Sequence, residues 1–294
     1  MPVFSAATGW LLFAGLVLCA GTLSTRFLVL PREDAPDTVP TSYLARLGRA
    51  GALVVSVALL LVFVRQLVEF RDPFAPLSED VSLLLGSAWG TAWLRAIVAA
   101  AAATTGFWMA EGYRRGGWLL AGVSLLGLAF FPGITGHAGG EQPPLRWLAV
   151  GADALHVLAA GSWVGGLTVV MLVDRRARRQ LGASLLPLLV PRFSPVAMAS
   201  VAILVLTGVL ASWLHLSSVR AAWETPYGRL LSAKVALVVL TLLLGAVNWR
   251  RFTPRLTDPG GPDAMRRAAL AELAVGSLVL LVTAVLVRTS PMVL

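Results

Sequence analysis

The apolar positions of the chain fall into eight runs of about 20 residues, which short polar stretches separate. A helix that rises 1.5 Å per residue needs about 20 apolar residues to cross roughly 30 Å of hydrocarbon. Each run must be helical, because an open strand would leave backbone groups unpaired in lipid. The predicted membrane-spanning helices cover approximately residues 9–30, 47–70, 89–110, 117–134, 147–173, 193–215, 230–249 and 268–287.

The composition agrees with a membrane protein. Hydrophobic residues make up 57% of the chain and charged residues 13%, and the mean hydropathy is +0.79. This is too little polar surface to cover a water-soluble protein of this size. We therefore predict an all-α, polytopic membrane helix bundle, in which residues 1–294 form one transmembrane domain without a soluble domain.

The connection 71–87 holds an apolar stretch, 81–86, that is too short to span the membrane. We therefore expect this connection to form an interfacial or re-entrant segment that covers the outer mouth of the bundle.

The net charge of +9 is a topology signal, because the basic residues are unevenly placed. Most of them follow the first, third, fifth and seventh spans: Arg26, Arg32, Arg46, Arg49, Arg114, Arg115, Arg175, Arg176, Arg178, Arg179, Arg192, Arg250, Arg251, Arg255, Arg266 and Arg267. By the positive-inside rule these connections are cytoplasmic, and both termini are periplasmic. We therefore expect a multi-pass protein of the bacterial inner membrane, with lipid rather than nucleic acid as the partner of its surface.

The sequence offers little support for enzymatic chemistry. Cys19 is the only cysteine, which excludes an internal disulfide and an iron–sulfur cluster held by one chain. The chain has no glycine-rich phosphate loop of the kind that binds ATP. We therefore expect a protein that is not an enzyme.

The fifth span carries two polar side chains that point to metal chemistry. Charged or polar groups inside a membrane usually face the bundle interior or a water-filled cavity, because they are costly in lipid. Asp153 and His156 are three residues apart and lie on one helical face, where the carboxylate can orient the imidazole or raise its basicity. Imidazole is a common metal ligand, and a convergent set of histidines with carboxylates can bind copper.

All three histidines belong to the outer half of the predicted bundle. His137 follows the fourth span, His156 lies roughly 15 Å into the fifth span, and His215 ends the sixth. Together with Asp153 and with Glu69, at the outer end of the second span, they form the predicted copper site. The alternative is structural: His156 hydrogen-bonds a neighbouring helix, and the other two histidines are interfacial.

Three methionines form a possible relay for Cu(I) toward the inner side. Met109, Met171 and Met198 fall near the inner ends of their spans, and Cu(I) prefers soft thioether ligands. Methionine in an apolar helix is, however, more often a packing residue. Arg95 and Lys234 lie in outer halves of spans. They either snorkel outward or pair with Asp153 or Glu69 and keep the cavity near neutral.

Several short motifs resemble the copper resistance protein D family. In chain order they are Gly136-His137-Ala138, Asp153-Ala154-Leu155-His156, Trp163-Val164-Gly165-Gly166, Arg192-Phe193-Ser194-Pro195, Thr207-Gly208, Thr225-Pro226-Tyr227-Gly228-Arg229, Lys234 and Asn248. The similarity covers most of the chain and is densest over residues 137–255. It implies a bacterial inner-membrane protein of copper handling that moves copper inward from the periplasm, beside a small periplasmic copper-binding partner of the copper resistance C type.

Three functions remain open from the residues. The first is a permease that captures copper at the outer face and imports it. The second is a membrane cytochrome or redox protein, in which His156 and His215 ligate haem b and Arg95 with Lys234 pairs its propionates. The third is a copper-binding assembly or sensing partner that does not transport. The inner half offers mainly methionines and the end groups Glu111, Asn248 and Glu272, so the sequence supports capture better than conduction.

Overall fold

The computed structural model describes residues 2–30, 39–216, 218 and 220–289. Within these residues every regular element is helical, as predicted. Eight helical segments in this part of the chain are long and apolar enough to cross a membrane. They are α1 with η1 (Pro2–Ser24, Thr25–Val29), α2 (Thr41–Phe70), α4 (Ala88–Glu111), α5 (Arg115–Thr135), the continuous α6, η3 and α7 (Leu145–Ala160, Gly161–Gly165, Gly166–Leu181), α8 (Leu186–His215), α10 with η4 and η5 (Pro226–Val247, Asn248–Phe252, Thr253–Arg255) and α11 (Gly261–Leu286).

The predicted spans are confirmed, but most helices extend beyond their apolar runs. The second span starts at Thr41 rather than near residue 47, and the sixth starts at Leu186 rather than near residue 193. Hydropathy detects only the apolar helical turns that lie within the hydrocarbon layer. The helical hydrogen bonds continue into polar turns at the membrane surface. The fifth span is the longest, because α7 adds an arginine-bearing turn and ends at Gly182, whose φ is +69°.

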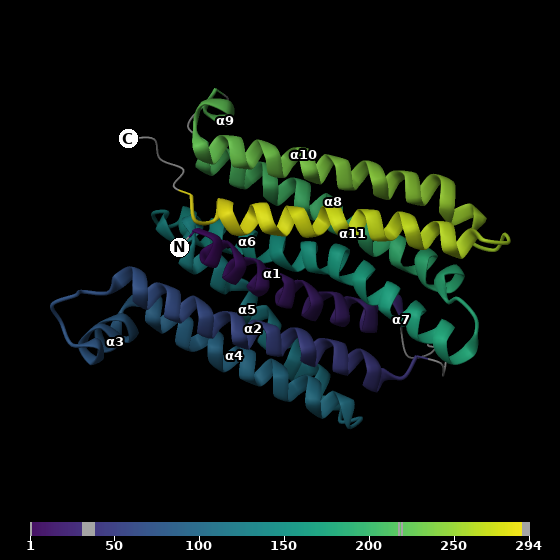
Figure 1. The fold of residues 1–294 in the computed structure, drawn as a ribbon, viewed down its shortest axis with the longest axis horizontal. Helices are drawn as coiled ribbons and strands as arrows, with labels where there is room; N and C mark the ends of the chain where they lie inside the picture. Colours follow the sequence, from purple (N-terminus) through teal and green to yellow (C-terminus); the bar gives the residue numbers. More distant parts are fainter. Residues whose placement is uncertain (1, 31–38, 217, 219, 290–294) are drawn as a thin grey trace.

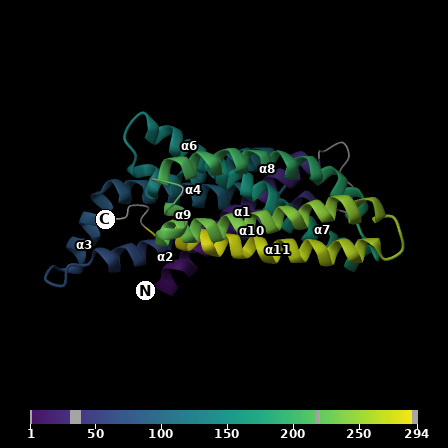
Figure 2. The same cartoon turned by 90° about the horizontal axis from the view of Figure 1, so that it is seen from above.

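The spans run roughly antiparallel to their neighbours and form one elongated bundle (Figures 1 and 2). Helix α1 lies near its centre and packs against α2, α5, α6, η3, α7 and α11. Helix α10 lies at the edge and packs mainly on α11, with exposed apolar side chains such as Val235 and Leu243. The exposed apolar faces agree with a multi-pass membrane protein, since lipid covers such faces.

The two ends of the bundle differ in chemistry. One end, where α1 begins and α11 ends, carries His137 and the start of α6, and we call it the histidine end. The other end carries the arginines of α7, η4 and early α11, including Arg178, Arg250 and Arg266, and we call it the arginine end. The structure therefore gathers at one end the basic connections that the sequence predicts to be cytoplasmic.

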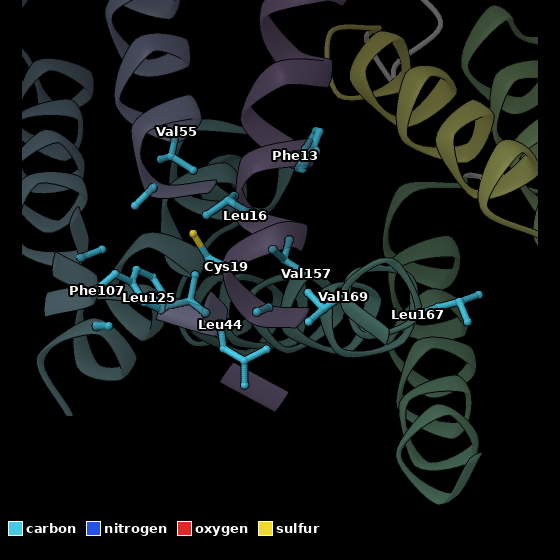
Figure 3. Close-up of a cluster of buried hydrophobic side chains, with 14 of the residues drawn as sticks. Phe13, Leu16, Cys19, Leu44, Val55, Phe107, Leu125, Val157, Leu167 and Val169 are labelled. Atoms are coloured by element: carbon cyan, nitrogen blue, oxygen red, sulfur yellow. The ribbon is translucent and has the colours of Figure 1, made fainter. Parts of the chain in front are cut away.

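A cluster of buried hydrophobic side chains surrounds α1 (Figure 3). Leu16 is 1% exposed and Cys19 is fully buried among side chains from α2, α4, α5 and α6. The Cys19 thiol donates a hydrogen bond to the carbonyl oxygen of Gly48 at 3.5 Å. The only cysteine of the chain is thus a packing residue.

Two glycines let α1 and η3 pack backbone to backbone. A Cβ added at Gly165 would lie 1.9 Å from the carbonyl oxygen of Val17, and one added at Gly21 would lie 2.1 Å from the carbonyl carbon of Gly165. Small residues at helix interfaces allow this close approach in membranes. Gly21 and Gly165 are therefore packing residues of this helix interface.

The connection after α2 contains a short helix, α3 (Leu77–Gly86), which begins before the apolar stretch 81–86. Asp80 on its buried side forms an ion pair with Arg71. Helix α3 packs on α2 and α4 and lies beside the bundle end rather than over its centre (Figure 1). It does not cover the cavity that holds the candidate site.

Candidate functional site

The histidine end contains a cavity of about 110 Å³ between α5, η2 (His137–Gly140), α6, α8 and the ends of α10 and α11. Three of the predicted ligands, His137, Asp153 and His156, line this cavity. Thr207 and Tyr227 complete its polar surface, and the rest is apolar or small. We call it the histidine cavity.

The hydrogen bond of His156 determines its tautomer. Nδ1 of His156 lies 2.8 Å from the hydroxyl oxygen of Thr207, and that hydroxyl donates its proton to the carbonyl oxygen of Ile203 at 2.7 Å. When the hydroxyl of Thr207 donates its one proton to this carbonyl, it accepts from Nδ1–H of His156. The neutral imidazole then keeps an unprotonated Nε2, the arrangement of a metal-binding histidine whose other nitrogen is held by a partner.

Asp153 lies against α5, on the same face of α6 as His156. A Cβ added at Gly133 would be 3.1 Å from Oδ2 of Asp153, so this glycine makes room for the carboxylate. The carboxylate is within electrostatic range of both Lys234 and His137. No ion pair between Asp153 and Lys234 is present among the described residues, so the predicted pairing of the two stays a prediction.

His137 enters the cavity from η2, just after α5. Its ring packs edge-on against Tyr227 with 5.7 Å between ring centroids, and Nε2 lies 3.5 Å from the carbonyl oxygen of Leu286. Elements far apart in the sequence, η2, α10 and α11, thus hold this ring. His137 is half-buried, whereas Tyr227 is 5% exposed.

Two predicted site residues lie elsewhere. Glu69 accepts a hydrogen bond from Arg288 at 2.6 Å and pairs with Arg65 at 3.8 Å, so its carboxylate belongs to an ion-pair group between α2, α1 and the end of α11. Arg95 is exposed and lines a separate hollow with Arg146 between α4, α5 and α6. The structure does not bring either residue to the histidine cavity.

The three methionines of the proposed relay do not share one surface. Met171 is 8% exposed and belongs to the hydrophobic core. Met109 lines a hollow beside Glu111 at the arginine end of α4, and Met198 lines a different cavity on α8. A continuous line through all three is therefore not formed.

His215 is the last residue of α8, but its side chain lies outside the described residues. Sites for cofactor-sized ligands usually measure about 300–1,000 Å³. The cavity beside His156 has a volume of about 110 Å³, and the haem alternative, which also needs His215, stays a prediction. A single metal ion is of the right size.

Among the described residues, no three His, Cys, Asp or Glu side chains converge tightly enough to form a closed metal site. His137, Asp153 and His156 instead line one cavity as separate donors. An open set of imidazole and carboxylate donors is suited to an ion that must enter and leave.

Sequence reasoning missed Thr207 and Tyr227 as site residues. Both occur in motifs that carry the family resemblance, Thr207-Gly208 and Thr225-Pro226-Tyr227-Gly228-Arg229, which was the available signal. Their roles depend on contacts across the bundle, 51 residues apart for Thr207 and His156, and helical periodicity cannot reveal such contacts.

Comparison with known proteins gives consistent results. The family model described as copper resistance protein D matches residues 187–286, which comprise nearly all of α8 to α11. The chain is 31% identical over 170 residues to "Copper transport protein CutJ" of Bacillus subtilis (strain 168), covering 58% of this chain and 30% of that protein. It is 30% identical over 160 residues to "Copper resistance protein D" of Pseudomonas syringae pv. tomato, covering 53% of this chain and 48% of that protein.

The matched region thus spans between about a third and a half of the curated relatives' length. No solved structure matches the chain. The family model covers the helices that supply Thr207, Tyr227 and Lys234, and the fold is an all-helical bundle with eight candidate spans in its described part. On these grounds the chain is similar to the copper resistance protein D family, most directly over residues 187–286.

Proposed function

We propose that this protein binds copper in the histidine cavity and carries it across the bacterial inner membrane toward the arginine end. The observation that carries the proposal is the hydrogen bond between Nδ1 of His156 and the hydroxyl of Thr207, which directs Nε2 away from this contact in a cavity shared with His137 and Asp153. The names of the relatives, a copper transport protein and a copper resistance protein, support copper as the substrate.

Copper is the cargo, and the residues of the cavity are its first ligands. Nε2 of His156 is available without loss of a proton, and the carboxylate of Asp153 supplies negative charge. Lys234 attracts the same carboxylate. An entering cation therefore competes with Lys234 for Asp153, so the ion is held firmly enough to enter and weakly enough to leave.

The proposed direction follows from the charge placement. The arginine end is expected to be cytoplasmic, so passage from the histidine cavity toward it is import. A small periplasmic protein of the copper resistance C type is the proposed donor of the ion to the histidine end. Passage needs no ATP site on this chain.

The test is copper uptake by proteoliposomes, with Cu(I) and Cu(II) supplied separately. We expect uptake to be lost in His156→Ala, because the central ligand is removed. We expect Thr207→Ala to weaken copper binding by about 10–100-fold, the usual cost of removing the partner that orients a metal-binding histidine. Thr207→Ser keeps the hydroxyl and should behave as the wild type.

Thr241→Ala is the matched control, because Thr241 is also a buried threonine that donates to a carbonyl four residues earlier, but it contacts no histidine. Unchanged uptake by folded, membrane-inserted His156→Ala would refute the proposal. If copper binds at His156 but does not enter the vesicles, the chain binds copper without transporting it, as an assembly or sensing partner would.

A further inference from the structure

A second cavity lies in the arginine half of the bundle, between η3, α7, α8, η4 and α11. Its volume is about 300 Å³. Its lining is mainly apolar, and its charged member is Glu272 of α11. None of the residues proposed for copper capture lines it, so this cavity, which we call the Glu272 cavity, needs its own explanation.

The carboxylate of Glu272 is held by two neutral donors. The indole Nε1 of Trp163 donates to Oε1 at 3.1 Å, and the amide nitrogen of Asn248 donates to Oε2 at 2.7 Å. The Glu272 residue is 6% exposed. Each oxygen retains a lone pair for a further partner, since a carboxylate can accept about four hydrogen bonds in all.

No cationic side chain among the described residues pairs with Glu272. A buried carboxylate within a membrane is costly unless it is paired, coordinates a metal or takes up a proton. The other fully buried acids, Asp80 and Asp174, each pair with arginine. Glu272 therefore differs from them in having an open position for a cation.

Two thioether side chains line the same cavity. Met265 is 4% exposed and lies two turns before Glu272 on α11, whereas Met198, which lines the cavity from α8, is 57% exposed. Thioether sulfur is a soft ligand that favours Cu(I), while the carboxylate supplies the single negative charge that a monovalent ion needs in a medium of low dielectric. The donor set thus fits Cu(I) better than a divalent ion.

The Glu272 cavity lies along the same helices as the histidine cavity. Trp163 is seven residues beyond His156 on one continuous span, which corresponds to roughly 10 Å along the helix. Between them Val164 packs on Gly276, where an added Cβ would be 3.3 Å from the valine side chain. Val164 belongs to the π-helical turn η3, a type of element often found at functional sites.

We propose that Glu272, Met265 and Met198 form a second binding site for Cu(I), in the arginine half of the path that begins at His156. Asn248 and Trp163 position the carboxylate. This inference rests on the proposed copper function, and it supplies a ligand set in the half of the path where the sequence offered mainly methionines and end groups.

The test measures how many ions of Ag(I), a redox-stable substitute for Cu(I), the purified full chain binds in lipid nanodiscs, by equilibrium dialysis and metal analysis. The wild type is expected to bind one ion at each cavity. Glu272→Gln and the double variant Met198→Leu with Met265→Leu should each lose one ion and keep the other. Met171→Leu is the matched control, because Met171 is a core methionine outside both cavities, and it should bind as the wild type does.

The outcomes separate this inference from the proposed function. If His156→Ala loses an ion while Glu272→Gln and the methionine variant lose none, the second site is refuted and the first stands. If only the Glu272 and methionine variants lose an ion, the proposed capture site fails and the second site stands. If Glu272→Gln abolishes copper uptake but keeps both ions, Glu272 carries a proton rather than copper, and the inference is also refuted.

Glu272→Gln was chosen because it preserves the shape of the side chain. If this variant does not fold, the double variant Met198→Leu with Met265→Leu gives an independent measurement of the second site.

Discussion

At the scale of single residues, the candidate site depends on positions that carry no reactive group. Gly133 illustrates this, because its missing side chain leaves room for Oδ2 of Asp153, and an added Cβ would come within 3.1 Å of that oxygen. Thr207 likewise binds no metal itself, but its hydroxyl fixes which nitrogen of His156 is free. The ligands are thus placed by neighbours on other helices.

Gly133→Ala is expected to weaken copper binding without unfolding the protein. The new methyl group forces the Asp153 carboxylate to move by a few tenths of an ångström, and metal ligands tolerate little displacement. Copper affinity measured by competition with a chromophoric chelator checks this. Gly127→Ala on the same helix is the control, because nothing lies within 4 Å of its added Cβ. Equal affinity in both variants would contradict the role given to Gly133.

Residue-level prediction from the sequence succeeded where local geometry was sufficient. The spacing of Asp153 and His156 placed them on one face, and both line one cavity with His137. Glu69 was grouped with them because of its depth, but the structure pairs it with Arg288, 219 residues away. The depth of a residue along its span does not show which neighbouring helix its side chain faces. That direction is determined by how helices distant in the sequence pack together.

At the scale of elements, the placement of both cavities depends on how closely η3 approaches α1. Gly21 and Gly165 allow contact between the two backbones, and this contact fixes the span that carries both His156 and Trp163. Helical periodicity does not predict the π-helical turn at Gly161–Gly165, so Glu272 could be predicted only as a polar group near the end of its span. Its link to Trp163 follows from the packing of α11 beside this turn.

Gly165→Ala is expected to lower thermal stability strongly. Its Cβ would lie 1.9 Å from the carbonyl oxygen of Val17, so α1 would have to move away, and overpacking of this kind typically costs about 1–3 kcal/mol. Thermal unfolding in detergent, followed by loss of monodisperse protein, measures the effect. Gly151→Ala on the same span has no atom within 4 Å of the added Cβ and should melt like the wild type. A wild-type melting temperature for Gly165→Ala would show that α1 is less tightly held.

At the scale of the whole molecule, the bilayer made the architecture predictable. Hydrocarbon thickness sets the length of every span, so hydropathy was enough to find eight of them. Loop and surface helices obey no such constraint, and α3 was accordingly misplaced as a cover for the outer mouth. The two cavities, one at the histidine end and one in the arginine half, could be found only from the three-dimensional packing of the helices.

The buried thiol of Cys19 makes the chain a ready template for cysteine labelling. Because this thiol is fully buried, a membrane-impermeant maleimide should not react with it in the native protein. Single cysteines placed at exposed Ser78, at the histidine end, and at exposed Thr257, at the arginine end, then report orientation directly. We expect Ser78→Cys to react in intact cells from the periplasmic side and Thr257→Cys to react only after lysis. The reverse pattern would overturn the proposed direction of copper movement, while the two cavities and their order along the bundle would stay as described.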